Sequence, residues 1–548
     1  MKIKYLTLTL ICLGVIASAQ SPLRERTLVS TDRSFYAAGD NIKCSAFCLE
    51  SEGAFSSFSG IAYLEVYSQD GTIATGKVAL VNGRGGCSID IPADTPTGNY
   101  RIAAYTATNK NEEGYDFNTG SRVISIFNTS GTARVPGGVE IASEAPASVS
   151  APHNSSAVRV SIGDSESGFI PISVSAADGA SLSISVWKDE GFAKYDNNTL
   201  STLEKSAWKK PTTHKNNVIG EYDGEVIYTR INGRADTSAI YLSSPGSNSD
   251  IYKGSLLPDG RTVFFTDNIF GDKDVAIISM SHDKKAFDVE IESPFKEIQA
   301  DVIPKLQIAP SMKAGLTSLD AALRIGKAFD ADTLYDVLNF RKLDLLGPCQ
   351  NKYNLDDYTR FVTMREVFIE YLHDIHIERS KGELHMNVKT LDVKGIPSFR
   401  HFTRSLILLD GVPVMDDNVI YEMDPHLIKC VEIYPSNYSF GPVFFCGAAN
   451  FVTYTGNLAG AQLGTGTRIL SFKGASVPAV YSAVKAAFDP DFPAISETLY
   501  WNPMAKVSKE EAFDFEVVAP ALPGNYVITV EGYTADGTPV FFSKDFSL

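Results

Sequence analysis

The chain has 548 residues, 44% of them hydrophobic and 11% aromatic, which is enough to build several domains with buried cores. Its net charge is −16, which argues against binding to nucleic acid or to an anionic lipid surface. After residue 19 no stretch reaches about 18 uninterrupted apolar residues, so we expect no transmembrane segment.

The first 19 residues have the pattern of a signal peptide. Lys2 and Lys4 supply a positive start, residues 6–16 form an apolar core too short to span a bilayer, and residues 17–19 form a small-residue cleavage site. We therefore expect the protein to be exported. Its predicted location is the periplasm or the outer membrane, with the cell surface as a further option.

The mature chain contains few cysteines for its length, so its fold is not expected to depend on disulfides. Cys44 and Cys48 are four residues apart and share one face of a strand, and Cys87 follows on a later strand within reach of one of them. Export permits a bridge, and buried free thiols are the alternative. The six cysteines are Cys44, Cys48, Cys87, Cys349, Cys430 and Cys446.

Residues 20–128 are predicted to form one β-sandwich, because short alternating segments follow one another at hairpin spacing. Residues 31–40 read Thr-Asp-Arg-x-x-Tyr-x-x-Gly-Asp, and residues 96–102 read Pro-Thr-Gly-Asn-Tyr-Arg-Ile. This pair of motifs resembles the second macroglobulin domain of the α2-macroglobulin family. The thioester sequence Cys-Gly-Glu-Gln of that family does not occur in the chain, so the resemblance implies no covalent thioester trapping.

The next two segments differ in composition. Residues 129–157 are rich in Ser, Ala, Pro and Gly and are predicted to be a linker. Residues 158–306 again alternate, most clearly at residues 181–186, and are predicted to form one or two β-sandwich domains.

Residues 307–469 are predicted to combine a helical segment with an α+β domain. Apolar residues recur at helical spacing from Leu316 to Ile325 and again from Leu334 to Leu338, and another helical stretch covers about 355–373. The strand and turn at residues 406–414 and the segments that follow it resemble the plug domain of TonB-dependent outer-membrane receptors. Too few residues follow for the barrel of about 22 strands that such a plug normally occupies.

Residues 470–548 are predicted to form a C-terminal Ig-like β-sandwich. Residues 523–532 repeat the phrase seen at residues 96–104, which indicates a repeated fold. The fold class is therefore mainly β and multi-domain, with Ig-like or macroglobulin-like β-sandwiches plus an α+β plug-like domain. This domain order resembles a group of exported Bacteroidetes proteins.

The candidate chemistry is sparse. Glu366, Glu370 and His373 would share one helical face and form half of a carboxylate-bridged metal site, but no second Glu-x-x-His segment completes it. We interpret them as a solvated helix face. No nucleophile elbow, zinc-protease motif or phosphate-binding glycine loop occurs, so we expect no catalytic residue, no metal and no cofactor.

Aromatic residues between the last two plug-like strands are the candidate contact with a partner, since an exposed aromatic loop suits a protein interface. Core packing of these residues is the alternative. We expect a non-enzymatic envelope protein that binds an envelope or outer-membrane protein. The alternatives are an accessory to a separate TonB-dependent transporter, a surface adhesin and an unrecognised hydrolase. The candidate contact residues are Tyr434, Tyr438, Phe440, Phe444 and Phe445.

Overall fold

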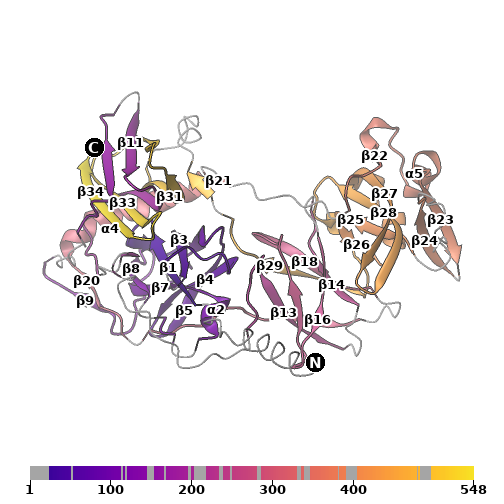
Figure 1. The fold of residues 1–548 in the computed structure, drawn as a ribbon, viewed down its shortest axis with the longest axis horizontal. Helices are drawn as coiled ribbons and strands as arrows, with labels where there is room; N and C mark the ends of the chain where they lie inside the picture. Colours follow the sequence, from indigo (N-terminus) through magenta and orange to yellow (C-terminus); the bar gives the residue numbers. More distant parts are fainter. Residues whose placement is uncertain are drawn as a thin grey trace, which may run out of the picture.

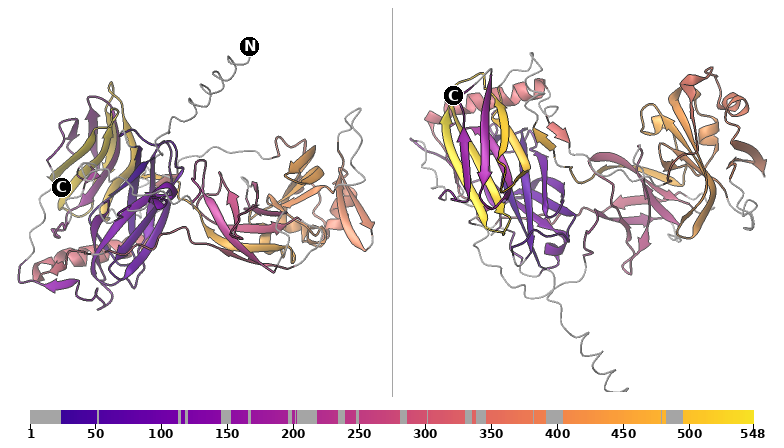
Figure 2. Two further views of the ribbon diagram at one scale, coloured as in Figure 1. Left: turned by 60° about the horizontal axis from the view of Figure 1, so that its bottom comes forward. Right: turned by 45° about the horizontal axis from the view of Figure 1, so that its top comes forward.

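The molecule is elongated, with two β-sandwiches side by side at one end, a third in the middle and an α+β unit at the other end (Figures 1 and 2). The predicted signal peptide lies outside the described residues. Within these residues, no helix is both long enough and apolar enough to cross a bilayer. The computed structural model describes residues 24–50, 53–112, 115–117, 120–144, 153–165, 168–195, 199–200, 202, 218–233, 239–246, 250–280, 286–300, 302–329, 335–337, 346–380, 382–390, 404–477, 479–481 and 495–548.

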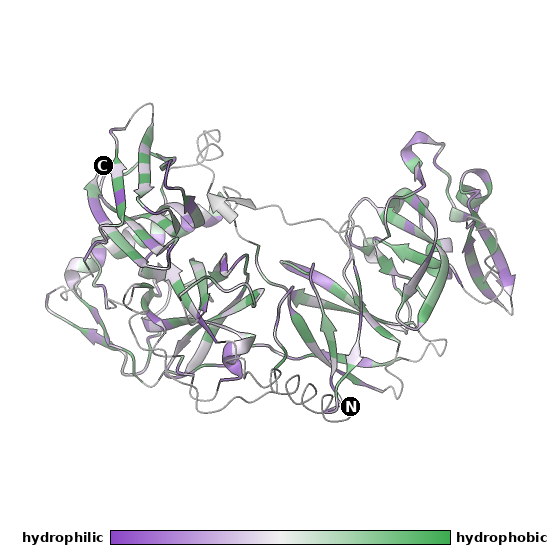
Figure 3. Ribbon diagram, viewed as in Figure 1, coloured by the Kyte–Doolittle hydropathy of each residue, from purple (hydrophilic) through white to green (hydrophobic). Residues whose placement is uncertain are grey.

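Strands account for 50% of the structure and helices for 10%. The prediction of a mainly β, multi-domain fold is therefore confirmed. Hydrophobic residues gather on the strands of the sandwiches, whereas the hairpin at the far end of the α+β unit carries mostly hydrophilic residues (Figure 3).

The N-terminal sandwich consists of a three-stranded sheet packed on a five-stranded sheet. Alternate residues of both sheets point inward and form one core. A short helix, α2 (Ala107–Lys110), follows the third strand of the larger sheet. In sheet order the strands are β1 (Glu25–Thr31), β3 (Asn41–Glu50) and β6 (Arg84–Asp90), then β2 (Phe35–Ala37), β8 (Arg122–Phe127), β7 (Gly98–Thr106), β4 (Ile61–Ser68) and β5 (Gly71–Ala79).

A second sandwich, here called the mixed sandwich, is built from two distant parts of the chain. Its two sheets share one core, and strands from residues 158–188 pair directly with strands from residues 498–547. The three-stranded sheet is β10 (Val158–Ile162), β11 (Phe169–Ala176) and β32 (Phe513–Val518), and the four-stranded sheet is β31 (Thr498–Val507), β12 (Ala180–Lys188), β33 (Asn525–Thr534) and β34 (Pro539–Ser547).

The repeated phrase has the same structural role in both sandwiches. The Tyr100 hydroxyl donates to the Pro96 carbonyl at 2.7 Å, and the Tyr526 hydroxyl donates to the Leu522 carbonyl at 2.9 Å. Each tyrosine thus fixes the chain four residues before it, as the tyrosine corner of Ig-like sandwiches does.

The middle domain is also a sandwich of two four-stranded sheets with a shared core. One strand comes from a segment nearly two hundred residues further along the chain, between Thr467 and Lys473. The sheets are β16 (Ser255–Leu256), β17 (Thr262–Phe265), β13 (Val226–Asn232) and β19 (Asp288–Ile291), then β15 (Ile251–Lys253), β14 (Ile240–Ser243), β18 (Asp272–Ser279) and β29 (Thr467–Lys473).

The α+β module covers residues 346–463 and packs on the outer face of the β14–β18 sheet. Its five-stranded sheet has one parallel pair, β25 with β28. The predicted helix at 355–373 is shorter than expected, because it is interrupted before Met364. The elements are β22 (Asn351–Asn354), β27 (Ile428–Phe440), β28 (Val443–Thr453), β25 (Leu406–Leu409) and β26 (Val412–Pro413), the hairpin β23 (Ile375–Ser380) and β24 (Glu383–Val388), and the helices α5 (Met364–Glu370) and α6 (Asn418–Tyr421).

The predicted turn at Asp410-Gly411 closes the module. Asp410 has a φ of 47°, which few residues other than glycine adopt. Its buried carboxylate accepts hydrogen bonds from the Thr453 and Leu458 backbone N–H groups, both at 2.7 Å. The carboxylate therefore holds the end of β28 and the following chain in place, which is a structural role.

Helix α4 (Lys313–Ala328) confirms the first helical pattern, but it does not belong to the α+β module. It packs across the two end sandwiches, where Leu319 contacts a core that includes Phe35, Trp187 and Val527. Gly315 permits the close approach, because a Cβ atom there would lie 3.0 Å from the Phe192 ring. The second helical pattern is wrong at Val337, which lies in the strand β21 (Tyr335–Val337), and Leu334 and Leu338 lie outside the described residues.

Long-range strand pairing corrects the predicted domain boundaries. The 158–306 segment divides between the mixed sandwich and the middle domain, and the 470–548 segment shares its sheets with residues 158–188. The linker at 129–157 contains a short strand, β9 (Val139–Ile141), which pairs with β20 (Leu306–Ile308). The segment β30 (Ala479–Tyr481) pairs with β21. Local alternation identifies strands, but it does not specify which distant strand is the partner.

Candidate functional site

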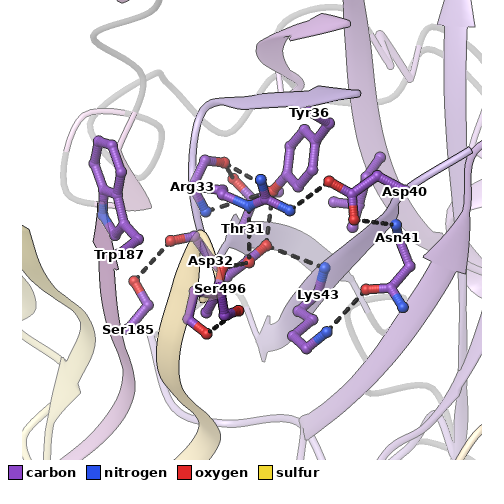
Figure 4. Close-up of polar contacts among 12 residues, drawn as sticks. Thr31, Asp32, Arg33, Tyr36, Asp40, Asn41, Lys43, Ser185, Trp187 and Ser496 are labelled. Atoms are coloured by element: carbon purple, nitrogen blue, oxygen red, sulfur yellow. Dashed lines mark hydrogen bonds and ion pairs between the residues drawn. The ribbon is translucent and has the colours of Figure 1, made fainter. Parts of the chain in front are cut away.

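The residues of the first motif form a buried polar cluster directly after β1 (Figure 4). The Asp32 Oδ1 atom accepts hydrogen bonds from the Tyr36 hydroxyl at 2.8 Å and from the Lys43 backbone N–H at 3.1 Å. The Arg33 guanidinium donates to the Asp40 carboxylate at 2.6 Å and lies 4.6 Å from the centre of the Tyr36 ring. The spacing of the motif thus brings its charged and aromatic residues into one network.

This network also reaches into the mixed sandwich. Asp32 Oδ2 accepts from the Thr498 hydroxyl at 2.5 Å. The Asp32 carbonyl accepts from the Ser185 hydroxyl at 2.8 Å (Figure 4). Thr498 and Ser185 lie in two neighbouring strands of the mixed sandwich. We call this network the Asp32 clasp and define it as Asp32, Arg33, Tyr36, Asp40, Lys43, Ser185 and Thr498.

Burial and the neighbouring carboxylates together set the electrostatics of the clasp. It lowers the pKa of Arg33, but the neighbouring Asp40 and Asp32 carboxylates outweigh this effect and leave that pKa above its ordinary value. Burial and the Asp32 carboxylate raise the pKa of Tyr36. Arg33 therefore stays charged and Tyr36 stays protonated, so neither group is prepared to exchange a proton. The clasp joins two domains and does not resemble a reactive centre.

A cavity of about 400 Å³ lies between the N-terminal sandwich and the middle domain. Its volume is within the range of small-molecule sites, and such sites often occur at domain interfaces. Its polar lining is provided by both domains, and its apolar lining includes Phe295 and Phe472. Whether the cavity is a ligand site or a contact between domains therefore depends on what its charged groups contact.

Those charged groups mostly contact one another. The Lys77 ammonium pairs with the Glu225 carboxylate across the domain boundary, and the Tyr63 hydroxyl donates to Glu221 Oε1 at 2.7 Å. The Lys110 ammonium donates to the Pro294 carbonyl at 2.6 Å. We call this group the Lys77 joint and define it as Tyr63, Lys77, Lys110, Glu221 and Glu225.

Both glutamates of the Lys77 joint are buried and only partly hydrogen-bonded. Glu221 Oε2 and Glu225 Oε2 have no hydrogen-bond partner among the described residues. Burial raises the pKa of Glu221 to about 7, and the Tyr63 hydroxyl only partly offsets this effect. Burial also raises the pKa of Glu225 despite the nearby Lys77. The charge of Glu221 therefore depends on pH near neutrality, and the Glu225 carboxyl binds its proton more tightly than usual.

The structure separates the five predicted aromatic contact residues. Tyr434 and Phe445 are buried, and Tyr438 and Phe440 are partly buried against the core of the α+β module. Only Phe444 of the five is exposed, at 60%. The pattern predicted an exposed loop, but these residues form the end of the β27–β28 hairpin, so alternate side chains turn inward.

A different surface of the module gathers exposed apolar and aromatic side chains around Arg360. This guanidinium donates to the Pro425 and Ile428 carbonyls and lies 5.7 Å from the centre of the Tyr454 ring. Tyr, Arg and large apolar groups are the residue types that dominate protein interfaces. We define the Arg360 surface by Arg360 together with its exposed neighbours Tyr358 (39%), Val362 (79%), Leu427 (41%) and Tyr454 (51%).

Two of the residues predicted to form a solvated helix face, Glu366 and His373, make local polar contacts. Glu366 accepts a hydrogen bond from the Thr363 backbone N–H at 3.1 Å and thereby caps the helix. The His373 ring contacts the Tyr371 carbonyl. Among the described residues, no group of three or more His, Cys, Asp or Glu side chains is arranged to hold a metal ion.

Sequence reasoning missed the Lys77 joint and the Arg360 surface. A signal for the joint exists, because Lys77 interrupts the apolar end of β5 and a charge at such a position requires a buried partner. Its partners Glu221 and Glu225 lie in a turn-rich segment without periodicity, so no pattern links them to Lys77. The Arg360 surface has no sequence signal, because its members come from three separate segments.

Comparisons with known proteins do not add an identity. No protein-family model and no curated protein matches the chain. Among solved structures, the native conformation of Escherichia coli alpha-2-macroglobulin is 9% identical with a TM-score of 0.23, covering 95% of this chain and 39% of that chain. A Salmonella alpha-2-macroglobulin is 10% identical with a TM-score of 0.22, covering 97% and 40%. An Escherichia coli adhesin is 11% identical with a TM-score of 0.15, covering 47% and 60%.

This chain spans about two fifths of the length of the two macroglobulins. The fold class therefore rests on the strands and sheets described above.

Proposed function

We propose that the chain is an exported, non-enzymatic binding protein that contacts an envelope protein through its α+β module. In this proposal the sandwiches act as a scaffold, and the module is the plug-like part that meets the partner. The buried charged clusters support a scaffold role, because the Asp32 clasp and the Lys77 joint each connect two domains.

The observation that carries the proposal is the Arg360 surface. Tyr454 is 51% exposed and lies beside a guanidinium that the Pro425 and Ile428 carbonyls hold in place, and Val362, two residues after Arg360, is 79% exposed. The guanidinium also pairs with the exposed Asp356 carboxylate at 2.5 Å, and a fixed arginine bordered by exposed aromatic and apolar residues suits a protein interface. The module that carries this surface lies at one end of the elongated molecule (Figure 1).

The test is an affinity pull-down of the tagged mature chain from detergent-solubilised envelope, read by mass spectrometry. We expect a partner that the Leu427→Ser/Tyr454→Ser variant fails to capture. Leu256→Ser is the matched control, because Leu256 is 62% exposed but lies in the middle domain. A partner retained by the double variant would contradict the Arg360 surface.

A Phe444→Ser variant tests the hairpin contact separately. Loss of the partner from this variant alone would transfer the interface to the β27–β28 hairpin. Recovery of one outer-membrane barrel in near-stoichiometric amount would identify the protein as an accessory to a separate TonB-dependent transporter. Recovery of soluble or surface proteins instead would favour a free-standing binding protein or an adhesin.

A further inference from the structure

Two cysteines of the N-terminal sandwich face each other across a pair of strands. Cys44 in β3 is directly opposite Cys87 in β6 in the antiparallel register. Both side chains point into the core between the two sheets, with exposures of 0% and 3%. The Cys87 side chain is also a hydrogen-bonding neighbour of the Cys44 thiol.

This arrangement meets the geometric requirement for a disulfide. Residues directly opposite in an antiparallel pair have Cα atoms about 4.5–5.5 Å apart, and disulfides span Cα separations of about 4.4–6.8 Å. The two Cβ atoms lie on the same face of the sheet, because opposite residues share their orientation. The strands therefore need no shift to bring the sulfur atoms together.

Cys48, Cys430 and Cys446 have no cysteine opposite them in the strand register, and Cys349 precedes β22 and lies outside that register. Cys48 lies four residues along β3, about 13 Å from Cys44, and its backbone N–H pairs with Gly83. In the α+β module, Cys430 is opposite Val452 and Cys446 is opposite Asn437. The register thus selects one pair from the pairings that the sequence left open.

We propose that Cys44 and Cys87 form a disulfide in the mature protein. A thiolate of the pair attacks the disulfide of an oxidised dithiol protein or of oxidised glutathione, forming a mixed disulfide and releasing one thiolate. The second cysteine thiolate then attacks the mixed disulfide and releases the other. The pair loses two protons and two electrons, and the oxidant's disulfide is reduced to two thiols.

The bridge forms before the core closes. In the folded chain both sulfur atoms are inaccessible to an oxidant, and burial raises the pKa of the Cys44 thiol. Oxidation therefore accompanies the pairing of β3 with β6. The bridge closes a loop that contains β4 and β5, and it ties the two strands that complete the smaller sheet.

The proposed disulfide rests on the export that the proposed function assumes, because disulfides persist in oxidising compartments. The experiment compares the mature chain made in the oxidising periplasm of an expression host with the same chain made in its reducing cytoplasm. Free thiols are alkylated under denaturing, non-reducing conditions, and the tryptic peptides are read by mass spectrometry. We expect a link between residues 44–77 and 85–101 in the periplasmic sample and alkylated thiols in the cytoplasmic sample.

The peptide 44–77 also contains Cys48, so a Cys48→Ser variant removes the ambiguity. The link must persist in this variant and disappear in Cys87→Ala. Alkylated Cys44 and Cys87 in the periplasmic sample, or a link to any other cysteine, would overturn the proposal. Thiol trapping in the native cells separates the two ideas: free thiols there with a bridge in the expression host would contradict export, and the pairing would stand.

Stability gives an independent readout. We expect dithiothreitol to lower the Tm of the periplasmic protein by about 5 °C or more, because reduction restores the freedom of the unfolded loop. The same reagent must leave the Tm of the Cys44→Ala/Cys87→Ala variant unchanged. An equal response of both proteins would contradict the bridge.

Discussion

Two joints attach the N-terminal sandwich to its neighbours, the Asp32 clasp and the Lys77 joint. They differ in how completely their buried carboxylates are hydrogen-bonded. At the Asp32 clasp both oxygens of the central carboxylate accept hydrogen bonds, including one from the mixed sandwich. At the Lys77 joint each glutamate has one buried oxygen without a partner among the described residues, and a cavity lies beside them. A carboxylate whose two oxygens both accept hydrogen bonds is held in one geometry, whereas the charge of a buried carboxylate with an unpartnered oxygen depends on protonation. The comparison predicts a rigid joint and an adjustable joint on opposite sides of one domain.

Removing the centre of the clasp has the largest expected effect. Asp32→Ala leaves the Thr498 and Tyr36 hydroxyls without their shared acceptor and leaves Arg33 with Asp40 as its remaining acid. We expect a loss of about 3–5 kcal/mol in the free energy of unfolding, measured by denaturant titration. Asp70→Asn is the control, because Asp70 is exposed in a turn and should change stability by less than about 0.5 kcal/mol. An effect as small as that of the control would remove the distinction between the joints.

Breaking the ion pair of the Lys77 joint has the second largest effect. Lys77→Met leaves Glu225 buried without its cation, which we expect to cost about 2–4 kcal/mol of unfolding free energy. The double variant Lys77→Met/Glu225→Gln should recover most of this loss, because neither member of the pair then carries an uncompensated charge. A double-mutant cycle by thermal denaturation measures the coupling, and simple additivity would show that the pair does not hold the joint.

The pH dependence of the free energy of unfolding also distinguishes the Lys77 joint from the Asp32 clasp. The pKa of Glu221 is raised to about 7 in the folded protein from an ordinary value of 4.5, so the folded state binds this proton more tightly than the unfolded state. The associated stability is fully present below about pH 4.5 and declines as pH rises to about 7, by on the order of 3 kcal/mol at most.

Unfolding titrations between pH 4.5 and 8 measure this slope. Glu221→Gln should flatten it, because the amide does not titrate. Burial also raises the pKa of Glu497 to about 7 beside the clasp, so Glu497→Gln is the matched comparison. If Glu497→Gln alone flattened the slope, the pH-sensitive joint would be the clasp.

The N-cap of helix α5, in the α+β module, provides the smallest expected change in stability, because its contacts are local. The Thr363 side chain accepts a hydrogen bond from the Glu366 backbone N–H at the start of α5. Thr363→Ala should cost about 1 kcal/mol. Glu370→Ala, at the other end of the same helix, should cost less than half as much. Hydrogen exchange of the α5 amides measures both, and an effect that spread to the sandwiches would contradict a local role.

The sequence predicts local features of this molecule better than distant ones. Alternation identifies the strands of the N-terminal sandwich, and the repeated phrase, which contains Tyr100 and Tyr526, indicates the repeated fold. The partner of β12 was not predictable, because strands from many segments satisfy the same alternation. The pattern of aromatic residues from Tyr434 to Phe445 predicts an exposed loop. A long hairpin with inward-facing rings has the same composition, so composition does not distinguish the two.

The candidate site was less predictable than the fold. The residues of the first motif were recognised, but their role as a contact between domains depends on Thr498 and Ser185, which no local pattern links to Asp32. The Lys77 joint likewise depends on two glutamates in an irregular segment. Interactions between domains depend on the tertiary arrangement, so the spacing of residues along the sequence gives little indication of them.

The mixed sandwich has a consequence for the order in which the chain folds. Trp187 contacts Thr529, and the two residues are 342 positions apart. During synthesis, β12 therefore emerges long before the strands that flank it, and its edges stay open while the middle domain and the α+β module are made. Contacts of such separation slow folding and expose unpaired strand edges to association. We therefore expect the chain to depend on chaperones until its last strands pair with β12.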